Sequence, residues 1–206
     1  MTLTLYSMPS SGNSYKLRLM LALLGREYRH VALEYETAEL AEAHATGTLP
    51  MGKLPVLVLD DGTALPESNA ILCYLAQGTD WLPDDPLARA RVLGWMFFEQ
   101  NRHETVIAVR AGIQKYASRA HLATPERLAE LLDSGHSVLR VMEDHLCNHD
   151  WLVGNQPSVA DIALYAYTHT AGTLGGFEMA RFPAINEWLA KVAALPGYVG
   201  LDDLPE

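Results

Sequence analysis

A serine lies in the turn before the first predicted helix of the chain, where its hydroxyl could stabilise an anion. The turn is predicted because Pro9 and Gly12 interrupt the alternating apolar pattern that precedes them. Ser11 then lies beside the backbone N–H groups of a helix start and the positive end of the helix dipole, which favour a negative charge. A serine in this position can equally serve only as a helix cap.

A second candidate is the sequence Lys53-Leu54-Pro55, which ends a loop and opens a predicted strand. Proline is tolerated as the first residue of a strand, and its peptide bond can be cis, which would turn the N–H and C=O groups of Leu54 outward to pair with an extended peptide. Lys53 is the only Lys or Arg between Arg29 and Arg89, in a stretch with ten carboxylates, so it could receive a carboxylate of a ligand. A solvated lysine beside a trans proline is the simpler alternative.

A third candidate is the pair Glu67-Ser68 at the start of another predicted helix. Ser68 and the N–H groups that follow it could hold a carboxylate, while Glu67 could accept a hydrogen bond from an amine. This combination suits the head of an amino acid. The alternative is that Ser68 only caps the helix, with a favourable acid beside it.

The charge balance disfavours nucleic acids and anionic membrane surfaces as partners. The chain has 206 residues, and its 15 Lys and Arg against 25 Asp and Glu give a formal net charge of −10, which repels phosphates. No run of about 18 apolar residues lacks a charge or a proline, so no membrane span is predicted. Residues 1–6 show no signal-peptide pattern, which predicts a cytoplasmic protein.

Metal and dithiol chemistry are also disfavoured. The two cysteines, Cys73 and Cys147, are too few for a zinc cluster and form no Cys-x-x-Cys pair. The eight histidines show no spacing typical of metal ligands. We therefore expect no metal site.

The periodicity of residues 1–77 predicts a βαβαββα unit. The alternation or β-rich composition of residues 2–7, 30–33, 55–59 and 63–65 is typical of strands. Helical spacing begins at about Gly12, with Gly25 at the C-cap, and recurs at residues 36–45 and from Ser68 to about Ala76. The unit is predicted to bind the ligand because all three candidate sites lie in it.

The remainder of the chain is predicted to be an all-helical domain, residues 86–206, after a proline-bearing linker at residues 78–85. Helical spacing runs from Pro86 to about residue 117, as one long helix or two joined ones, and then over residues 125–147 and 182–194. Ser158 and Asp161 form a capping box at the start of a further, buried helix. The predicted fold class is therefore α/β plus all-α.

Four segments, in this order, resemble motifs of the cytosolic glutathione S-transferases, and the similarity spans essentially the whole chain. They are residues 6–21, 52–59, 67–75 and 153–164. The resemblance is to bacterial, serine-type members similar to the theta and zeta classes. It implies a thioredoxin-like domain with a mixed sheet, a helical-bundle domain that forms an electrophile pocket, and a homodimer with the site near its interface.

The resemblance also implies a role for each candidate residue, with glutathione as co-substrate and a small hydrophobic electrophile as second substrate. Ser11 is similar to the serine that donates a hydrogen bond to the glutathione sulfur. Leu54 and Pro55 are similar to the residue that pairs with the cysteinyl backbone and the cis-proline after it. Glu67 and Ser68 resemble the clamp for the γ-glutamyl group. Lys53 resembles a basic residue near the glycyl carboxylate, and Asp161 resembles a buried folding residue.

Two parts of the site stay open at the level of sequence. Tyr6 ends the first strand near the position of the catalytic tyrosine of other classes, and it is the second choice after Ser11. The electrophile pocket is predicted to include Met8 to Ser10 and residues from one helical face, which core packing would explain equally well. These residues are Trp95, Phe98, Arg102, Val106 and Arg110.

The same site would serve more than one reaction. The leading hypothesis is transfer of glutathione to small hydrophobic electrophiles. A glutathione-dependent isomerase or a disulfide reductase is a rival, because the same thiolate can add reversibly or attack a disulfide. A protein that binds glutathione without catalysis is the third alternative, since fold does not guarantee chemistry.

Overall fold

Within residues 3–205, which the computed structural model describes, four short strands form one mixed sheet in the order β2-β1-β3-β4. β1 pairs in parallel with β2 and antiparallel with β3, and β3 pairs antiparallel with β4. The elements of this first unit are β1 (Leu3–Ser7), α1 (Gly12–Leu23), β2 (Tyr28–Ala32), α2 (Ala38–Ala45), β3 (Val56–Val58), β4 (Ala64–Pro66) and α3 (Ser68–Ala76). The thioredoxin-like βαβαββα order predicted from the sequence is confirmed.

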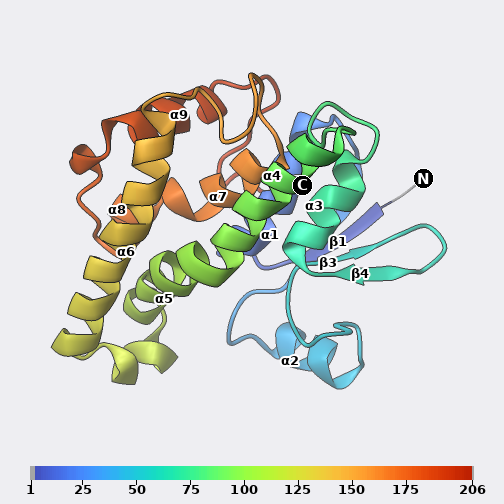
Figure 1. Cartoon of the computed structure of the whole chain (residues 1–206). Coiled ribbons are helices and arrows are strands. Elements are labelled where there is room, and N and C mark those ends of the chain that lie inside the picture. The colour runs from blue at the N-terminus through green and yellow to red at the C-terminus, as the bar shows by residue number, and fades with distance from the viewer. Residues whose placement is uncertain (1–2, 206) are drawn as a thin grey trace. The chain divides into compact units, whose positions relative to one another are not determined.

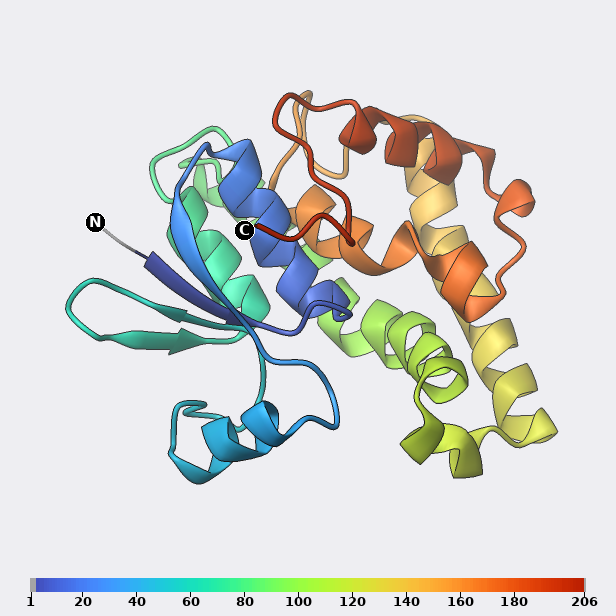
Figure 2. The ribbon, with the colours of Figure 1, turned by 180° about the vertical axis from the view of Figure 1, so that it is seen from behind.

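The two faces of the sheet are covered by different helices. α1 and α3 pack against each other on one face, and α2 lies on the other (Figures 1 and 2). Leu5 and Leu57 are paired neighbours with no exposed surface, whereas Val56 belongs to a small apolar cluster that includes Ala43 of α2. Alternate residues of a strand point to opposite faces, so the alternation at β1 and β3 places one apolar set under each layer.

α1 ends where the sequence predicts. Its last residue is Leu23, and Gly25 follows with φ +60, a conformation that glycine adopts without strain. The N–H of Arg26 donates to the carbonyl of Leu21 at 2.9 Å, and the N–H of Gly25 donates to that of Ala22 at 2.9 Å. This pair of bonds closes the helix and turns the chain into β2.

The second unit is helical. Its elements are α4 (Pro86–Phe98), a π-helical turn (Glu99–His103), α5 (Glu104–Lys115), a 3₁₀ turn (Ala117–Leu122), α6 (Pro125–Leu146), α7 (Val159–Thr168), α8 (Ala171–Gly175), a second 3₁₀ turn (Met179–Arg181) and α9 (Pro183–Ala193). The stretch predicted as one or two helices from Pro86 is interrupted at the π-helical turn and not at Gly94 or Gly112. There His103 is fully buried, with Nε2 3.0 Å from the Thr168 hydroxyl.

The buried helix predicted behind the Ser158 capping box is α7, and it is almost entirely buried. Asp161 Oδ2 accepts hydrogen bonds from the N–H and hydroxyl of Ser158 at 2.8 and 3.0 Å. Its Oδ1 accepts from the N–H of Leu152 and from Nε1 of Trp188, both at 3.0 Å. One carboxylate therefore fixes the start of α7, the preceding loop and α9.

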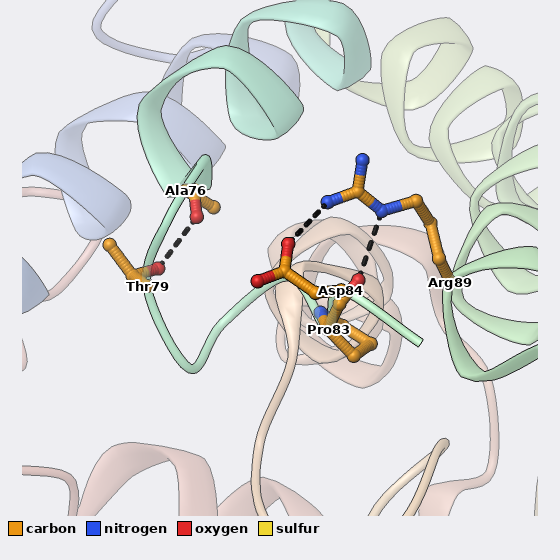
Figure 3. A network of polar contacts seen from close by, with 5 residues as sticks. All are labelled: Ala76, Thr79, Pro83, Asp84 and Arg89. Atoms are coloured by element: carbon orange, nitrogen blue, oxygen red, sulfur yellow. Dashed lines mark hydrogen bonds and ion pairs between the residues drawn. The ribbon is translucent and has the colours of Figure 1, made fainter. Parts of the chain in front are cut away.

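The linker between the units makes local hydrogen bonds at each of its ends (Figure 3). After α3, the hydroxyl of Thr79 donates to the carbonyl of Ala76 at 2.7 Å. Before α4, Arg89 donates through Nε to the carbonyl of Pro83 at 2.9 Å and through Nη2 to Asp84 at 3.3 Å. Each end of the linker is thus anchored to its own unit.

The compact units differ from the predicted domains in one place. Residues from Ala194 onward group with the first unit, whereas the sequence analysis assigned all of 86–206 to the helical domain. The physical reason is that the carbonyls of Val199 and Leu201 accept hydrogen bonds from Tyr15 and Arg18, two buried side chains of α1. Residues 194–205 are called the tail segment below.

Candidate functional site

The turn between β1 and α1, which carries Ser11, is held by hydrogen bonds from α1. The N–H of Met8 donates to the Ser14 hydroxyl at 2.9 Å, and the N–H of Ser11 donates to the Met8 carbonyl at 3.1 Å. The guanidinium of Arg18 donates to the carbonyls of Met8 and Pro9 at 3.4 and 2.9 Å. The turn therefore has a defined shape before a ligand binds, which is what a preorganised site requires.

Glu34, which follows β2, holds the same turn from another side. Its two carboxylate oxygens accept from the N–H and the hydroxyl of Ser10 at 3.0 and 2.7 Å, and one of them also accepts from the N–H of Tyr35 at 2.7 Å. The sequence analysis missed Glu34, because it lies 24 residues from Ser10 and no local pattern marks it. With Arg18, it fixes the residues immediately before Ser11.

Ser11 occupies the N-cap position of α1, but its side chain makes no capping hydrogen bond. Its backbone is extended, with φ −93 and ψ 130, and no acidic residue lies in the first turn of the helix. An anion beside the Ser11 hydroxyl would therefore meet the positive end of the helix dipole without a competing carboxylate from that turn. This geometry favours the anion site over the simple cap.

The start of α3 corrects one detail of the sequence analysis. Glu67 occupies the N-cap position instead of Ser68, which is the first residue of the helix, and the Glu67 side chain makes no capping hydrogen bond. Glu67 has φ +69, a region that side-chain-bearing residues enter at a cost of about 1–3 kcal/mol and that is found most often at functional sites. The exposed carboxylate of Glu67 and the buried Ser68 thus lie side by side at a strained corner.

A network of side chains joins the starts of α1 and α3. The Ser68 hydroxyl donates to Oδ1 of Asn13 at 3.1 Å. Nζ of Lys16, which has no exposed surface, is 3.2 Å from Oδ1 of Asn69 and 3.5 Å from the Ser68 hydroxyl. The sequence analysis missed Asn13 and Lys16. Their spacing of three residues places both on one face of α1, near its start. Asn13, two residues after Ser11, thus links the Ser11 turn to Ser68 through one hydrogen bond.

The loop that precedes β3 contains the third candidate. The peptide bond between Leu54 and Pro55 is cis. Pro55 is buried, Leu54 is half-buried against the apolar cluster beneath α2, and the side chain of Lys53 is exposed. An exposed Lys53 is compatible with both interpretations, a solvated lysine and a lysine that binds a carboxylate of a ligand.

Tyr6 lies on the α2 face of the sheet. Its half-buried side chain packs against the apolar cluster that contains Leu33 and Leu49. This packing gives Tyr6 a structural role, whereas the Ser11 side chain has none in capping its helix.

The aromatic and basic side chains predicted on one helical face have partners within the helical unit. Trp95 meets Phe98 edge-on, with ring centroids 5.3 Å apart, and Arg102 lies over the Phe98 ring at 5.3 Å. Arg110 donates to the carbonyls of Gly175 and Leu128 at 2.7 and 2.6 Å. Arg110 therefore links α5 to α6 and α8. Arg102 is exposed.

Comparison with known proteins identifies the family. A family model of the glutathione S-transferase N-terminal domain matches residues 1–77, and one of the C-terminal domain matches residues 106–196. A solved glutathione S-transferase from Pseudomonas fluorescens Pf-5 is 43% identical, with a TM-score of 0.91 over 98% of this chain and 99% of that one. The chain belongs to the glutathione S-transferase family. A second solved family member, from Xanthobacter autotrophicus Py2, is 45% identical, with a TM-score of 0.89 over 97% and 96% of the two chains.

Other family members that this transferase resembles have diverse names. A maleylacetoacetate isomerase from Rhizobium meliloti is 29% identical over 96% of this chain and 88% of its own. The disulfide-bond oxidoreductase YfcG of Escherichia coli is 27% identical over 93% and 90%. A solved glutathione transferase from Burkholderia graminis, with two glutathione molecules bound per subunit, is 27% identical, with a TM-score of 0.81 over 95% and 85% of the two chains.

Neither a metal cluster nor a membrane helix is found in the part of this transferase that the structure describes. Among residues 3–205, no three or more His, Cys, Asp or Glu side chains are grouped so that they could hold a metal ion. In the same range, no helix is both long and apolar enough to cross a bilayer.

Below the Ser11 turn, His30 connects β2 to β1. Its Nε2 is 2.7 Å from the Ser7 hydroxyl, to which Arg18 also donates at 3.4 Å. Burial, and then the nearby charge of Arg18, lowers the pKa of His30. Burial is also the main cause that lowers the pKa of His136 and of His145. All three imidazoles are thus favoured in the neutral form.

We expect acid to destabilise this protein as pH falls below about 6.5, the ordinary pKa of histidine. In that window the unfolded chain takes up protons that His30, His136 and His145 resist in the folded state, so the free energy of unfolding decreases as pH decreases. Urea unfolding between about pH 7.5 and 5.5 measures it. His30→Gln should flatten the dependence, and a variant with the wild-type slope would contradict the role of His30.

Proposed function

We propose that this family member binds glutathione, stabilises it as a thiolate beside Ser11, and transfers it to small hydrophobic electrophiles. The observation that carries the proposal is the Ser11 turn. Its neighbours are fixed by Arg18 and Glu34, and the Ser11 hydroxyl stands uncommitted to capping at the start of α1. A hydroxyl donor and a helix N-terminus together favour a sulfur anion.

The chemistry asked of the protein is modest. A free thiol has a pKa of about 8.5 and is mostly protonated at neutral pH. A hydrogen bond from Ser11 and the helix end could lower that pKa by about one to three units, which releases the thiol proton to solvent. The thiolate sulfur then forms a bond to the electrophilic carbon, whose leaving group departs with the electron pair of the broken bond. Ser11 keeps its own proton throughout.

The remaining contacts follow the ends of the tripeptide. In this proposal the backbone of Leu54, before the cis Pro55, pairs with the cysteinyl residue, and Lys53 receives the glycyl carboxylate. Glu67 accepts from the γ-glutamyl amine. The Ser68 hydroxyl, which has one proton, turns it from Asn13 to the γ-glutamyl carboxylate, which the N–H groups at the start of α3 also bind. The buried Lys16, which donates to Ser68, adds positive charge at that end.

Ser68→Ala tests the proposed clamp. The variant loses one hydrogen bond to a carboxylate, a loss of about 1.5 kcal/mol, so KM for glutathione should rise about tenfold while kcat changes little. Steady-state kinetics with varied glutathione measures this. Ser134→Ala, at an exposed position of α6, is the control. An unchanged KM in Ser68→Ala would remove Ser68 from the clamp.

A disulfide reductase or a glutathione-dependent isomerase is the second candidate. It is supported by the resemblance to YfcG and to the maleylacetoacetate isomerase. In a reductase, the bound thiolate would attack a disulfide sulfur, and a second glutathione would resolve the mixed disulfide, so that two thiols are oxidised and one disulfide is reduced. The electrons come from glutathione in this scheme, because the side chain at position 11 is a hydroxyl and not a thiol.

One panel of substrates separates these candidates. Calorimetry with glutathione is followed by assays on aryl halides, an activated cis double bond and glutathione mixed disulfides. Turnover of the halides supports transfer, turnover of the double bond without net glutathione consumption supports isomerisation, and turnover of the disulfides supports reduction. Binding with no turnover on any of the three would favour a scaffold protein and overturn the enzymatic proposal.

We also propose that the protein acts in the cytoplasm as a homodimer. Dimerisation is supported by membership of the family and by exposed apolar side chains such as Phe97 of α4, which is 63% exposed. Light scattering on the purified protein tests the oligomeric state, and a mass near 22.7 kDa would contradict the dimer.

A further inference from the structure

Besides Lys16, helix α1 buries two large polar side chains. Tyr15 has no exposed surface, and Arg18 is 1% exposed. Buried polar groups are stable only when they are hydrogen-bonded, so both need acceptors inside the first unit. The residues that supply these acceptors are therefore part of the interior of the first unit.

The tail segment supplies those acceptors. The Tyr15 hydroxyl donates to the carbonyl of Val199 at 2.7 Å, and Nη2 of Arg18 donates to the carbonyl of Leu201 at 2.9 Å. The segment also approaches the helix backbone closely, because a Cβ on Gly197 would lie 3.0 Å from the carbonyl oxygen of Ala22. A chain about 180 residues further along the sequence is thus bonded directly to α1.

Arg18 is bonded at the same time to the turn that carries Ser11. Nη2 donates to the Pro9 carbonyl at 2.9 Å as well as to Leu201, and Nη1 donates to the carbonyl of Met8 at 3.4 Å. We propose that Arg18 is a positioning residue through which the tail segment holds the Ser11 turn in the shape that stabilises the glutathione thiolate. This inference rests on the proposed function, because it assigns a further residue to the same site.

The shape of the guanidinium explains why one residue can do this. It is a rigid planar fork, so its two Nη groups keep a fixed geometry toward the carbonyls of Pro9, Met8 and Leu201. A lysine ammonium keeps the charge but is a single point on a flexible stem, and it cannot bridge the same acceptors. When the Leu201 acceptor is lost, the guanidinium can rotate, and the turn that depends on it is free to shift.

The test compares two shortened chains. A chain that ends at Pro196 lacks the acceptors for Tyr15 and Arg18, whereas a chain that ends at Asp203 keeps both. The readout is the thiol pKa of bound glutathione, from the ultraviolet absorbance of the thiolate against pH. We expect the chain ending at Pro196 to raise this pKa by roughly half a unit to one unit, the size of one weakened hydrogen bond. The chain ending at Asp203 should match the wild type.

The direction of this shift separates positioning from simple charge effects. Ending the chain at Pro196 removes the side-chain carboxylates of Asp202, Asp203 and Glu206. Loss of negative charge by itself favours a thiolate and would lower its pKa. A rise therefore reports a displaced turn. A pKa that falls or stays at the wild-type value in the chain ending at Pro196 would overturn the inference.

Arg18→Lys provides a second route that does not depend on how the shortened chain folds. It should raise the bound-thiol pKa and lower kcat about threefold to tenfold at a pH below that pKa, with KM for glutathione little changed. Combined with the chain ending at Pro196, its effect on the pKa should be smaller than in the full chain, because both changes act on one network. Fully additive effects would contradict a route through Arg18.

The outcome for the wild type distinguishes this inference from the proposed function. If bound glutathione gives no thiolate signal with the wild-type protein, the proposed function fails. If the wild type gives the signal and both Arg18→Lys and the chain ending at Pro196 reproduce its pKa, the function stands and the inference alone fails.

Discussion

Ser11→Ala should raise the thiol pKa of bound glutathione by about one to two units, because one hydrogen bond to a charged sulfur is worth about 1.5–3 kcal/mol. At about pH 6.5 the fraction of thiolate, and with it kcat, should fall about tenfold to a hundredfold. The loss should shrink as pH rises, since more of the thiol then ionises without help. The pH profile of kcat and the absorbance of the bound thiolate measure both effects.

The same variant decides between the two interpretations of Ser11. A serine that caps a helix loses about 1 kcal/mol of stability on replacement by alanine. Because the Ser11 side chain makes no capping hydrogen bond, the urea midpoint of Ser11→Ala should stay at the wild-type value. A lower midpoint together with an unchanged pH profile of kcat would return Ser11 to a structural role.

Ser10→Ala is the matched control for Ser11→Ala. Its hydroxyl lies one residue away and donates to Glu34, so its loss removes a bond that holds the turn without removing the donor to sulfur. We expect a smaller change in kcat than for Ser11→Ala, together with some loss of stability. Tyr6→Phe completes the set, and a fall in kcat for that variant alone would move the catalytic role to Tyr6.

Local sequence patterns predicted the elements that carry the site and where the serine turn lies. The alternation before Pro9, the helical spacing after Gly12 and the position of Gly25 depend only on neighbours in the chain, which is why they matched β1 and α1. The capping box of Ser158 and Asp161 is equally local, and it was found for the same reason.

The support of the Ser11 turn could not be predicted, because it comes from distant parts of the chain. Glu34 reaches Ser10 across 24 residues, and Leu201 reaches Arg18 across 183. Nothing in the residues around Arg18 indicates whether it is buried or exposed on an amphipathic helix. The tail segment was assigned to the helical domain because the sequence offers only adjacency, whereas Tyr15 and Arg18 require its carbonyls as acceptors.

Two backbone features also escaped the sequence analysis. Glu67 adopts φ +69, although glutamate rarely enters this region, so the pattern placed the cap one residue late, at Ser68. The π-helical turn at Glu99–His103 interrupts the stretch from Pro86 to about residue 117, which the sequence predicts as one long helix or two joined ones. Intrinsic propensity predicts neither feature.

Asp161→Ala should be the most destabilising of the substitutions considered, by about 3–5 kcal/mol, because it leaves several buried donors without an acceptor. The N–H groups of Leu152 and Ser158 and the indole Nε1 of Trp188 all donate to this carboxylate. Each unsatisfied buried donor costs about 1–3 kcal/mol. Urea unfolding at neutral pH measures the loss.

Asp161→Asn separates the geometry of the side chain from its acceptor capacity. The amide keeps one oxygen, which can accept from Leu152 and Trp188, but it places an NH₂ group against the N–H and hydroxyl of Ser158. Two donors then face each other in a site with no exposed surface, so the variant should lose nearly as much stability as Asp161→Ala. Burial raises the pKa of Asp161, and its four donors oppose that rise. An Asn variant as stable as the wild type would contradict the need for two acceptor oxygens at this position.

Asp150→Asn is the control for burial, because it changes an exposed carboxylate and the Asp161 variants change a buried one. Asp150 is an exposed carboxylate of the same unit, paired with Lys191 at 2.5 Å, and solvent screens such a pair. Its variant should therefore unfold at the wild-type midpoint.

Because the donors to Asp161 all belong to the helical unit, a sample of Asp161→Ala kept folded in the cold should still show the wild-type thiol pKa of bound glutathione. A raised thiol pKa in that sample would mean that the Ser11 turn depends on the start of α7 as well as on Arg18 and Glu34.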